Sequence, residues 1–183
     1  MSDSPPPFTL PIRCARVSLR RFRDDDIDAF THYRALESVY RFQTWPRPYT
    51  HAHARALVED MVGGPLLRPA AWVQIAIAER SSDLLIGDIG TRTSSAPPWT
   101  YELGFTLSPD WQRQGLAHEA LRAWVDALVE HAQAHAIVAI TDARNLASKA
   151  LLERLGFVQT AREAAEYFGE PCIDERYELA CAR

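Results

Sequence analysis

The clearest pattern along the chain is a strand, a long amphipathic helix and a second strand in succession. Residues Tyr101–Leu107 are apolar and aromatic enough to predict the first strand, and Ile137–Ile140 predict the second. Between them, apolar residues recur on one stripe at helical spacing: Leu116, Ala120, Leu121, Trp124, Val125, Leu128 and Val129. A strand–helix–strand crossover predicts that the two strands lie parallel in one sheet.

The N-terminal half predicts two helices and three strands. We expect a first strand near Ala15–Phe22, followed by a helix whose start is favoured by the acidic run Asp24–Asp26. Thr50 is suited to cap a second helix. The segments Trp72–Glu79 and Leu84–Thr91 predict two strands joined by a hairpin turn.

The C-terminal part predicts a short helix and two strands. Asn145 is suited to begin the helix and Gly156 to end it, and Phe157 then starts the next strand. No repeat and no second set of elements appears. We therefore expect one domain over residues 13–183, preceded by a flexible, proline-rich lead-in at residues 1–12.

Composition indicates a soluble globular protein. Apolar residues make up 47% of the chain and charged residues 24%, and the formal net charge of −4 gives no support for nucleic acid or an anionic membrane as a partner. The start of the chain lacks a signal-peptide pattern, and no apolar run approaches the ~20 residues of a membrane helix. The three cysteines have neither disulfide-framework nor metal-ligand spacing, so a reducing cytoplasm fits them: Cys14, Cys172 and Cys181.

The turn at residues 112–117 is the strongest candidate for chemistry. It lies where a strand gives way to the long helix, so backbone N–H groups lack partners there and the positive end of the helix dipole faces the turn. Gly115 has no side chain, which lets a bulky anion approach the backbone. Phosphate binding is therefore predicted, with an ordinary strand-to-helix turn as the alternative. The turn is neither a P-loop nor a dinucleotide fingerprint.

A second segment, Asn145–Phe157, narrows down which phosphate-bearing ligand the turn at residues 112–117 would bind. Gln112-Arg113-Gln114-Gly115-Leu116-Ala117 resembles the acyl-CoA pyrophosphate loop of the GNAT acetyltransferase superfamily, and Asn145–Phe157 resembles the second cofactor segment of that family. The resemblance extends over nearly the whole chain. It is closest to the RimJ/RimL-type branch, with matching segments at residues 17–26, 85–90, 166–169 and 174–179.

The resemblance implies an α/β fold with a mixed, mostly antiparallel central sheet, helices on both faces and a parallel βαβ pair that splays apart to hold acetyl-CoA. The pantetheine arm would hydrogen-bond, like an added strand, to Phe105, Thr106 and Leu107. Amides of the turn would hold the pyrophosphate, with a further phosphate contact from the Arg113 side chain; the turn residues are Gln112, Arg113, Gln114, Gly115, Leu116 and Ala117. A solvated side chain is the alternative for Arg113.

The resemblance also implies how the thiolate of coenzyme A departs. Ser148 would stabilise it by a hydrogen bond, and Asn145 belongs to the same cofactor segment, although asparagine is also a favoured helix cap. Leu152 occupies the position where many relatives have a tyrosine that protonates the thiolate. Because a thiol has an ordinary pKa of about 8.5, it leaves acceptably as an anion near neutral pH.

Two carboxylates are candidates for the base that deprotonates the acceptor amine. The local sequence of Glu166 resembles the glutamate of RimL-type enzymes that acts through water, although the spacing from Ser148 needs a one-residue gap. Glu102, at the start of the predicted strand, is the second candidate. A solvent-facing carboxylate is the alternative for both. Trp45 and Tyr49 match the region that lines the acceptor pocket, with ordinary packing as the alternative.

No metal site is expected. His131 and His135 are four residues apart on the predicted long helix, but the glutamate of a His-Glu-x-x-His motif is missing and no third ligand is evident.

The residues and the resemblance together predict an N-acetyltransferase that moves acetyl from acetyl-CoA to a primary amine by direct attack through a tetrahedral intermediate. A protein N-terminal amine is the favoured acceptor, with a small-molecule amine or an antibiotic as alternatives. The alternative function is a non-catalytic acyl-CoA-binding sensor or scaffold. We expect a cytoplasmic monomer or homodimer that binds neither nucleic acid nor membrane.

Overall fold

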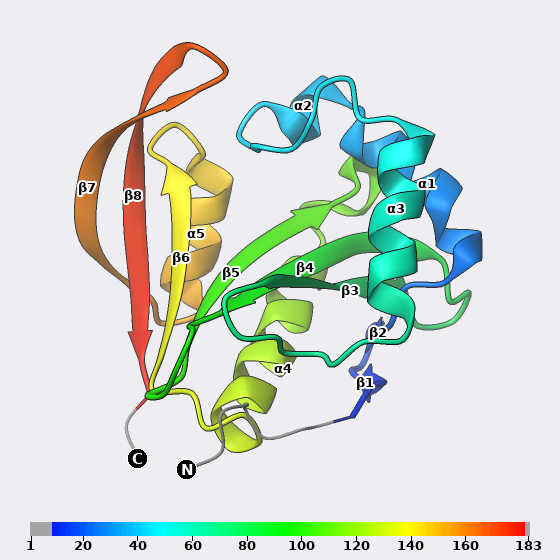
Figure 1. Cartoon of the computed structure of the whole chain (residues 1–183), viewed down its shortest axis with the longest axis horizontal. Helices are drawn as coiled ribbons and strands as arrows, with labels where there is room; N and C mark the ends of the chain where they lie inside the picture. The colour runs from blue at the N-terminus through cyan, green and yellow to red at the C-terminus, as the bar shows by residue number, and fades with distance from the viewer. Residues whose placement is uncertain (1–8, 182–183) are drawn as a thin grey trace.

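The protein, seen in a computed structural model that describes residues 9–181, is built around one eight-stranded sheet (Figure 1). The order of strands across the sheet is β1-β2-β3-β4-β5-β6-β8-β7. In chain order the strands are β1 (Ile12–Arg13), β2 (Val17–Arg20), β3 (Trp72–Glu79), β4 (Leu85–Thr93), β5 (Thr100–Leu107), β6 (Ala136–Asp142), β7 (Val158–Tyr167) and β8 (Glu170–Ala180).

Helices cover both faces of this sheet. The helices α1 (Ile27–Arg34), α2 (Glu37–Tyr40) and α3 (His51–Val62) lie on one face, and α4 (Leu116–Glu130) and α5 (Leu146–Arg154) on the other (Figure 1). Two short 3-10 turns, Asp24–Asp26 and Pro109–Trp111, precede α1 and α4. The predicted mixed, mostly antiparallel sheet with helices on both faces is confirmed.

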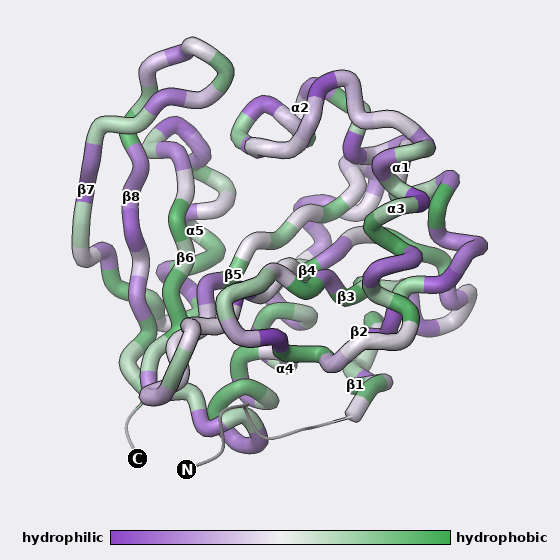
Figure 2. Tube along the Cα trace, in the orientation of Figure 1, coloured by the Kyte–Doolittle hydropathy of each residue, from purple (hydrophilic) through white to green (hydrophobic). Residues whose placement is uncertain are grey.

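Two hydrophobic clusters fill the space between the helices and the sheet. The larger one lies under α4, where the fully buried Trp124 donates a hydrogen bond to the Thr91 hydroxyl at 2.8 Å. The smaller one lies under α1 and α3 and includes Phe30, Tyr33 and Val58. Figure 2 shows hydrophobic residues along β6 and α4, whereas β7 and β8 carry many hydrophilic residues.

The parallel pair β5–β6 is short and then divides. Pairing joins Thr100–Leu103 to Ala136–Ala139 and stops there. Beyond that point β5 continues alongside β4 as far as Leu107, and β6 continues alongside β8 as far as Asp142. The sheet therefore opens into two arms (Figure 1). Both the predicted parallel crossover and its splay are present.

Most predicted elements lie within a few residues of the observed ones, with two omissions. Thr50 caps α3 as predicted, since its hydroxyl accepts a hydrogen bond from the His53 amide. Gly156 has a φ of 93°, as expected for a residue that ends a helix. The two-residue β1 and the four-residue α2 were not predicted because neither is long enough to show a period.

The predicted lead-in is only partly visible. Residues 1–8 lie outside the described range, while Ile12 belongs to β1 and Leu10 packs against the larger cluster. Across residues 9–181, every helix is too short or too polar to cross a lipid bilayer.

A buried ion pair fixes α1 to the sheet. Arg34 donates to the Asp88 carboxylate at 2.6 Å, and the Tyr33 hydroxyl donates to the other oxygen of Asp88 at the same distance. The Arg34 guanidinium also lies over the rings of Phe30 and Trp45, 4.3 and 4.2 Å from their centroids. Because removal of one partner would strand a buried charge, this contact holds α1 and the loop after it in one position.

Candidate active site

The turn before α4 presents a row of free main-chain donors. Gly115, the N-cap residue of α4, has a φ of 79°, and Arg113 has a φ of 60°. Within the described residues, the backbone N–H groups from Arg113 to His118 donate to no carbonyl or side chain. The positive end of the α4 dipole adds to these donors, so the turn has the character of an anion site.

Gln112 differs from the rest of the turn because its amide is already hydrogen-bonded. Its amide donates to the Pro109 carbonyl, and its side chain donates to the Leu107 carbonyl at 2.8 Å. It therefore ties the turn to the end of β5 and does not belong to the row of free amides. The prediction for the remaining turn residues stands.

A residue from the distant β1–β2 turn holds this site in shape. The Arg16 guanidinium donates to the Gln114 carbonyl at 2.8 Å and pairs with Glu119 at 2.8 Å. A Cβ added to Gly115 would lie 3.4 Å from Arg16 Nη2. Arg16 thus holds the Gln114 carbonyl away from the free amides and covers Gly115 on one side. No local sequence motif predicts this role of Arg16.

The gap between the two arms of the sheet is lined by unpaired main chain. The Ser94 amide donates to the Thr100 carbonyl and the Ser108 amide to the Ile86 carbonyl. These two bonds show that the even-numbered residues of β5 direct their main-chain groups to β4 and the odd-numbered residues direct theirs away from it. Phe105 and Leu107 consequently direct their N–H groups into the gap, whereas Thr106 directs its main chain to β4 opposite Asp88. The prediction that Thr106 contributes a backbone contact to the gap is therefore not supported.

The β6 side of the gap is also unpaired. The Ala143 amide donates to the Ile173 carbonyl. The residues of β6 whose main-chain groups are directed to β8 are therefore Ile137, Ala139 and Thr141. Ile140 turns its main chain towards the gap instead. Facing strand edges with free N–H and C=O groups can accept an extended polyamide chain between them.

Ser148 lies at the start of α5, close to the end of β6. Its hydroxyl makes no hydrogen bond within the described residues, and its amide donates to the Asn145 side chain at 3.2 Å. Asn145 is therefore the N-cap of α5, which fixes the segment that carries Ser148. Leu152 is 1% exposed and belongs to the core, so no general acid occupies the tyrosine position.

The two candidate bases lie on opposite faces of the sheet. Glu102 pairs at 3.9 Å with Arg92, whose position on β4 is on the α1–α3 face together with Asp88. Glu166 is exposed near the end of β7, and its alternation with Arg162 places it on the face that Glu175 shares with α5. Only Glu102 therefore lies on the face of the sheet that α1 and α2 cover.

Other carboxylates on the β6–β8 arm lie on the same face as Glu102. Asp142 is 3% exposed, lies opposite Asp174 across the strands and pairs with Arg144 at 2.6 Å. Hydrogen bonds from Arg144 lower the pKa of Asp142. The Tyr167 hydroxyl donates to Asp174, and burial together with this bond raises the pKa of Tyr167. No sequence motif joins the members of this group, so the sequence does not predict it.

The loop between α2 and α3 forms a wall across from the β7–β8 hairpin. Arg47 lies 4.2 Å from the centroid of the Phe168 ring at the hairpin tip, and this contact links the two walls. Trp45 is half-buried, and its indole donates to the Arg34 carbonyl at 3.3 Å. Tyr49 is 5% exposed and packs against Phe30, so it is a core residue and not, as predicted, part of an acceptor surface.

The candidate metal pair does not form a cluster. Within residues 9–181, no group of three or more histidine, cysteine, aspartate or glutamate side chains is arranged to hold a metal ion. His131 lies 3.9 Å from the neighbouring Glu130 at the end of α4.

Comparison with known proteins agrees with this arrangement. Residues 16–158 match the family model described as an acetyltransferase (GNAT) domain. A Bacillus subtilis (strain 168) protein described as the uncharacterized N-acetyltransferase YnaD is 25% identical over 145 residues, covering 79% of this chain and 81% of that protein.

Solved structures share the fold. A GNAT-family acetyltransferase from Bacillus anthracis superposes with a TM-score of 0.82 at 20% identity, over 93% of this chain and 98% of the other. RimL, described as a ribosomal L7/L12 alpha-N-protein acetyltransferase in complex with coenzyme A, superposes with a TM-score of 0.77 at 16% identity, again over 93% and 98%.

The chain therefore belongs to the GNAT acetyltransferase family, and it is an acyl-CoA-dependent acetyltransferase. The match to residues 16–158 contains β5, β6 and the turn before α4.

The exposed Arg113 offers a direct test of the turn. Arg113→Glu replaces a cation with an anion at an unchanged left-handed backbone position, so we expect the Kd for coenzyme A to rise roughly tenfold or more, with an unchanged melting temperature. Isothermal titration calorimetry measures the affinity, and Arg55→Glu on the exposed surface of α3, outside both cofactor segments, is the matched control. Equal affinity in wild type and Arg113→Glu would contradict a phosphate contact at Arg113.

Proposed function

We propose that this enzyme transfers acetyl from acetyl-CoA to the α-amine of a protein N-terminus. The observation that carries the cofactor part is the gap between β5 and β6, with unpaired main chain on both sides and free amides at its open end. A pantetheine arm carries amide groups that match those strand edges, and a pyrophosphate matches the amides from Arg113 to Ala117.

The proposed chemistry is direct attack. The neutral amine attacks the thioester carbonyl, and a main-chain N–H of β5 that faces the gap, such as that of Phe105, stabilises the oxyanion. The intermediate then releases the thiolate, to which Ser148 donates a hydrogen bond. Because the Ser148 hydroxyl makes no hydrogen bond within residues 9–181, whereas the Ser148 amide donates to Asn145, the hydroxyl is available for this role.

The character of the candidate base favours an α-amine as acceptor. An α-amine with a pKa of about 7.8 is neutral in roughly a seventh of molecules at pH 7, whereas a lysine amine with a pKa of about 10.4 is neutral in less than 0.1%. The difference of about 2.6 pKa units corresponds to about 3.5 kcal/mol. One partly exposed carboxylate, Glu102, suits the less demanding acceptor. The structural likeness to RimL supports the same choice.

The walls of the gap support an extended acceptor. Trp45 and Arg47 lie on one side, and Phe168 and the carboxylates Asp142 and Asp174 lie on the other. Negative charge beside the gap attracts a protonated amine before it loses its proton. We assign Trp45 to the acceptor side of the site.

Ser148→Ala tests thiolate stabilisation. Loss of the hydroxyl removes a hydrogen bond made mainly in the transition state, so we expect kcat to fall roughly tenfold while KM for acetyl-CoA changes little. Steady-state release of the free thiol measures both constants. Ala147→Ser, which places a hydroxyl at the preceding exposed position, should behave as wild type. An unchanged kcat in Ser148→Ala would leave Ser148 with a structural role only.

A pair of variants tests the base. Glu102→Gln should reduce kcat/KM most at low pH, where the acceptor is largely protonated and depends on the base, and the loss should shrink as pH rises through the pKa of the amine. Glu166→Gln is the matched variant on the α5 face and should leave the pH profile unchanged. The reverse result, with only Glu166→Gln altering the profile, would exclude Glu102 as the base.

The acceptor class is tested by competition among amines. Purified protein and acetyl-CoA are mixed with peptides carrying free or blocked N-termini, with spermidine and with an aminoglycoside, and thiol release is recorded for each. We expect turnover with free N-termini and none with blocked peptides that retain lysine. Turnover with spermidine or the aminoglycoside alone would assign the enzyme to a small-molecule acceptor.

A further inference from the structure

A basic pocket lies at the β1–β2 edge of the sheet, apart from the anion site at the turn before α4. Its volume is about 590 Å³, which is within the range of small-molecule sites. None of its lining residues belongs to the turn before α4 or to α5. Its charged lining consists of five arginines and one acid: Arg13, Arg20, Arg21, Arg23, Arg80 and Asp83.

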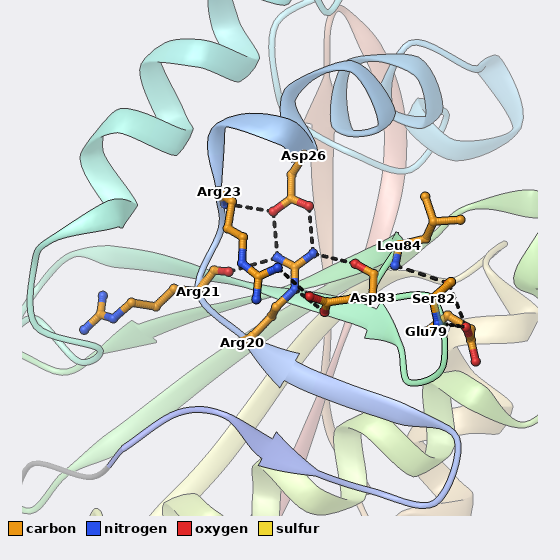
Figure 3. Close-up of polar contacts among 8 residues, drawn as sticks. All are labelled: Arg20, Arg21, Arg23, Asp26, Glu79, Ser82, Asp83 and Leu84. Atoms are coloured by element: carbon orange, nitrogen blue, oxygen red, sulfur yellow. Dashed lines mark hydrogen bonds and ion pairs between the residues drawn. The ribbon is translucent and has the colours of Figure 1, made fainter.

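One of these arginines forms a rigid wall of the pocket. The buried Arg20 makes a two-pronged pair with Asp26 at 2.7 and 2.8 Å, and its Nε donates to Asp83 at 2.9 Å. Its remaining donors reach the carbonyls of Arg21 and Asp83. Figure 3 shows the Arg20 guanidinium between the two carboxylates. Arg20 is therefore fully engaged within the protein.

The acids near the pocket are also fully engaged. Both oxygens of Asp83 are occupied, one by Arg20 and the other by Arg23, and both oxygens of Asp26 accept from Arg20. Among residues 9–181, the pocket lining therefore has no spare carboxylate with which to neutralise its other arginines.

Three arginines remain without a carboxylate partner among the described residues. Arg21 donates to the Met61 carbonyl at 3.1 Å, and its side chain extends away from Asp26 and Asp83 (Figure 3). Arg80 donates to the Cys14 carbonyl. The Arg13 side chain is exposed and makes no ion pair or hydrogen bond with residues 9–181. Uncompensated positive charge thus gathers around one cavity in a chain whose net charge is −4.

We propose that this pocket binds a small phosphate-bearing anion at a site separate from the cofactor gap. Guanidinium groups recognise phosphate through paired, charge-assisted hydrogen bonds, and they keep their charge at any physiological pH. Three arginines that lack carboxylates match an anion with several negative charges better than a single carboxylate. The anchored Arg20–Asp26–Asp83 group gives the pocket a wall that is ordered before the ligand arrives.

Inorganic tripolyphosphate is the probe for this site. Calorimetry is carried out on the full chain with saturating coenzyme A present, so that the turn before α4 is already occupied. We expect one site for tripolyphosphate, and a Kd raised roughly tenfold by Arg13→Gln and by Arg21→Gln, since each removes charge-assisted hydrogen bonds. Tricarballylate, a small tricarboxylate, should bind more weakly than tripolyphosphate.

The controls distinguish a pocket from general attraction to positive charge. Arg154→Gln changes an exposed arginine outside the pocket and should leave the Kd unchanged. An equal loss in Arg154→Gln, or wild-type affinity in Arg13→Gln, would overturn the site. Loss of tripolyphosphate binding when coenzyme A is present would assign the pocket to the cofactor site, and tighter binding of tricarballylate would overturn the phosphate assignment. Arg13→Gln decides the matter if Arg21→Gln does not fold, because the Arg13 side chain is exposed and the substitution leaves the main-chain pairing of β1 with β2 unchanged.

Discussion

The site depends on one feature, which is that β5 and β6 stop pairing and leave main-chain N–H and C=O groups without hydrogen-bond partners. After Leu103 and Ala139 the two strands keep their outer partners, β4 and β8, but lose each other. Unpaired N–H and C=O groups are costly unless water or a ligand satisfies them. A sheet that divides at this point therefore retains two facing edges suited to an extended molecule with its own amide groups.

Contacts between distant segments keep that opening in shape. On one arm, Arg16 from the β1–β2 turn holds the Gln114 carbonyl and Glu119, so the free amides before α4 have a defined arrangement. Across the gap, Arg47 and Phe168 join the loop after α2 to the β7–β8 hairpin. Below them, the Arg34–Asp88 pair fixes the base of that loop to the sheet. Residues outside the two cofactor segments, 112–117 and 145–157, thus hold the site in position.

The candidate residues could be predicted wherever backbone conformation decides their role. Gly115 and the amides after it follow from a strand that runs into a helix, and the Asn145 cap follows from the preference of helix starts for asparagine. Where the role depends on which face a side chain takes or on what covers it, only the structure shows the placement. Thr106 directs its main chain to β4, Tyr49 is enclosed by Phe30 and Arg34, and Glu166 lies on the α5 face.

The sequence by itself determined the order of helices and strands, the parallel crossover and the two segments that mark the family, because periodicity, caps and turns act over a few neighbouring residues. Only the tertiary structure decided that Glu102 and Asp142 share one face, that Arg16 supports the turn before α4, and that arginines from β1, from β2 and the residues after it, and from the turn after β3 surround one pocket. Those relations join residues tens of positions apart. They arise from strand pairing and packing, which no local pattern of side chains encodes.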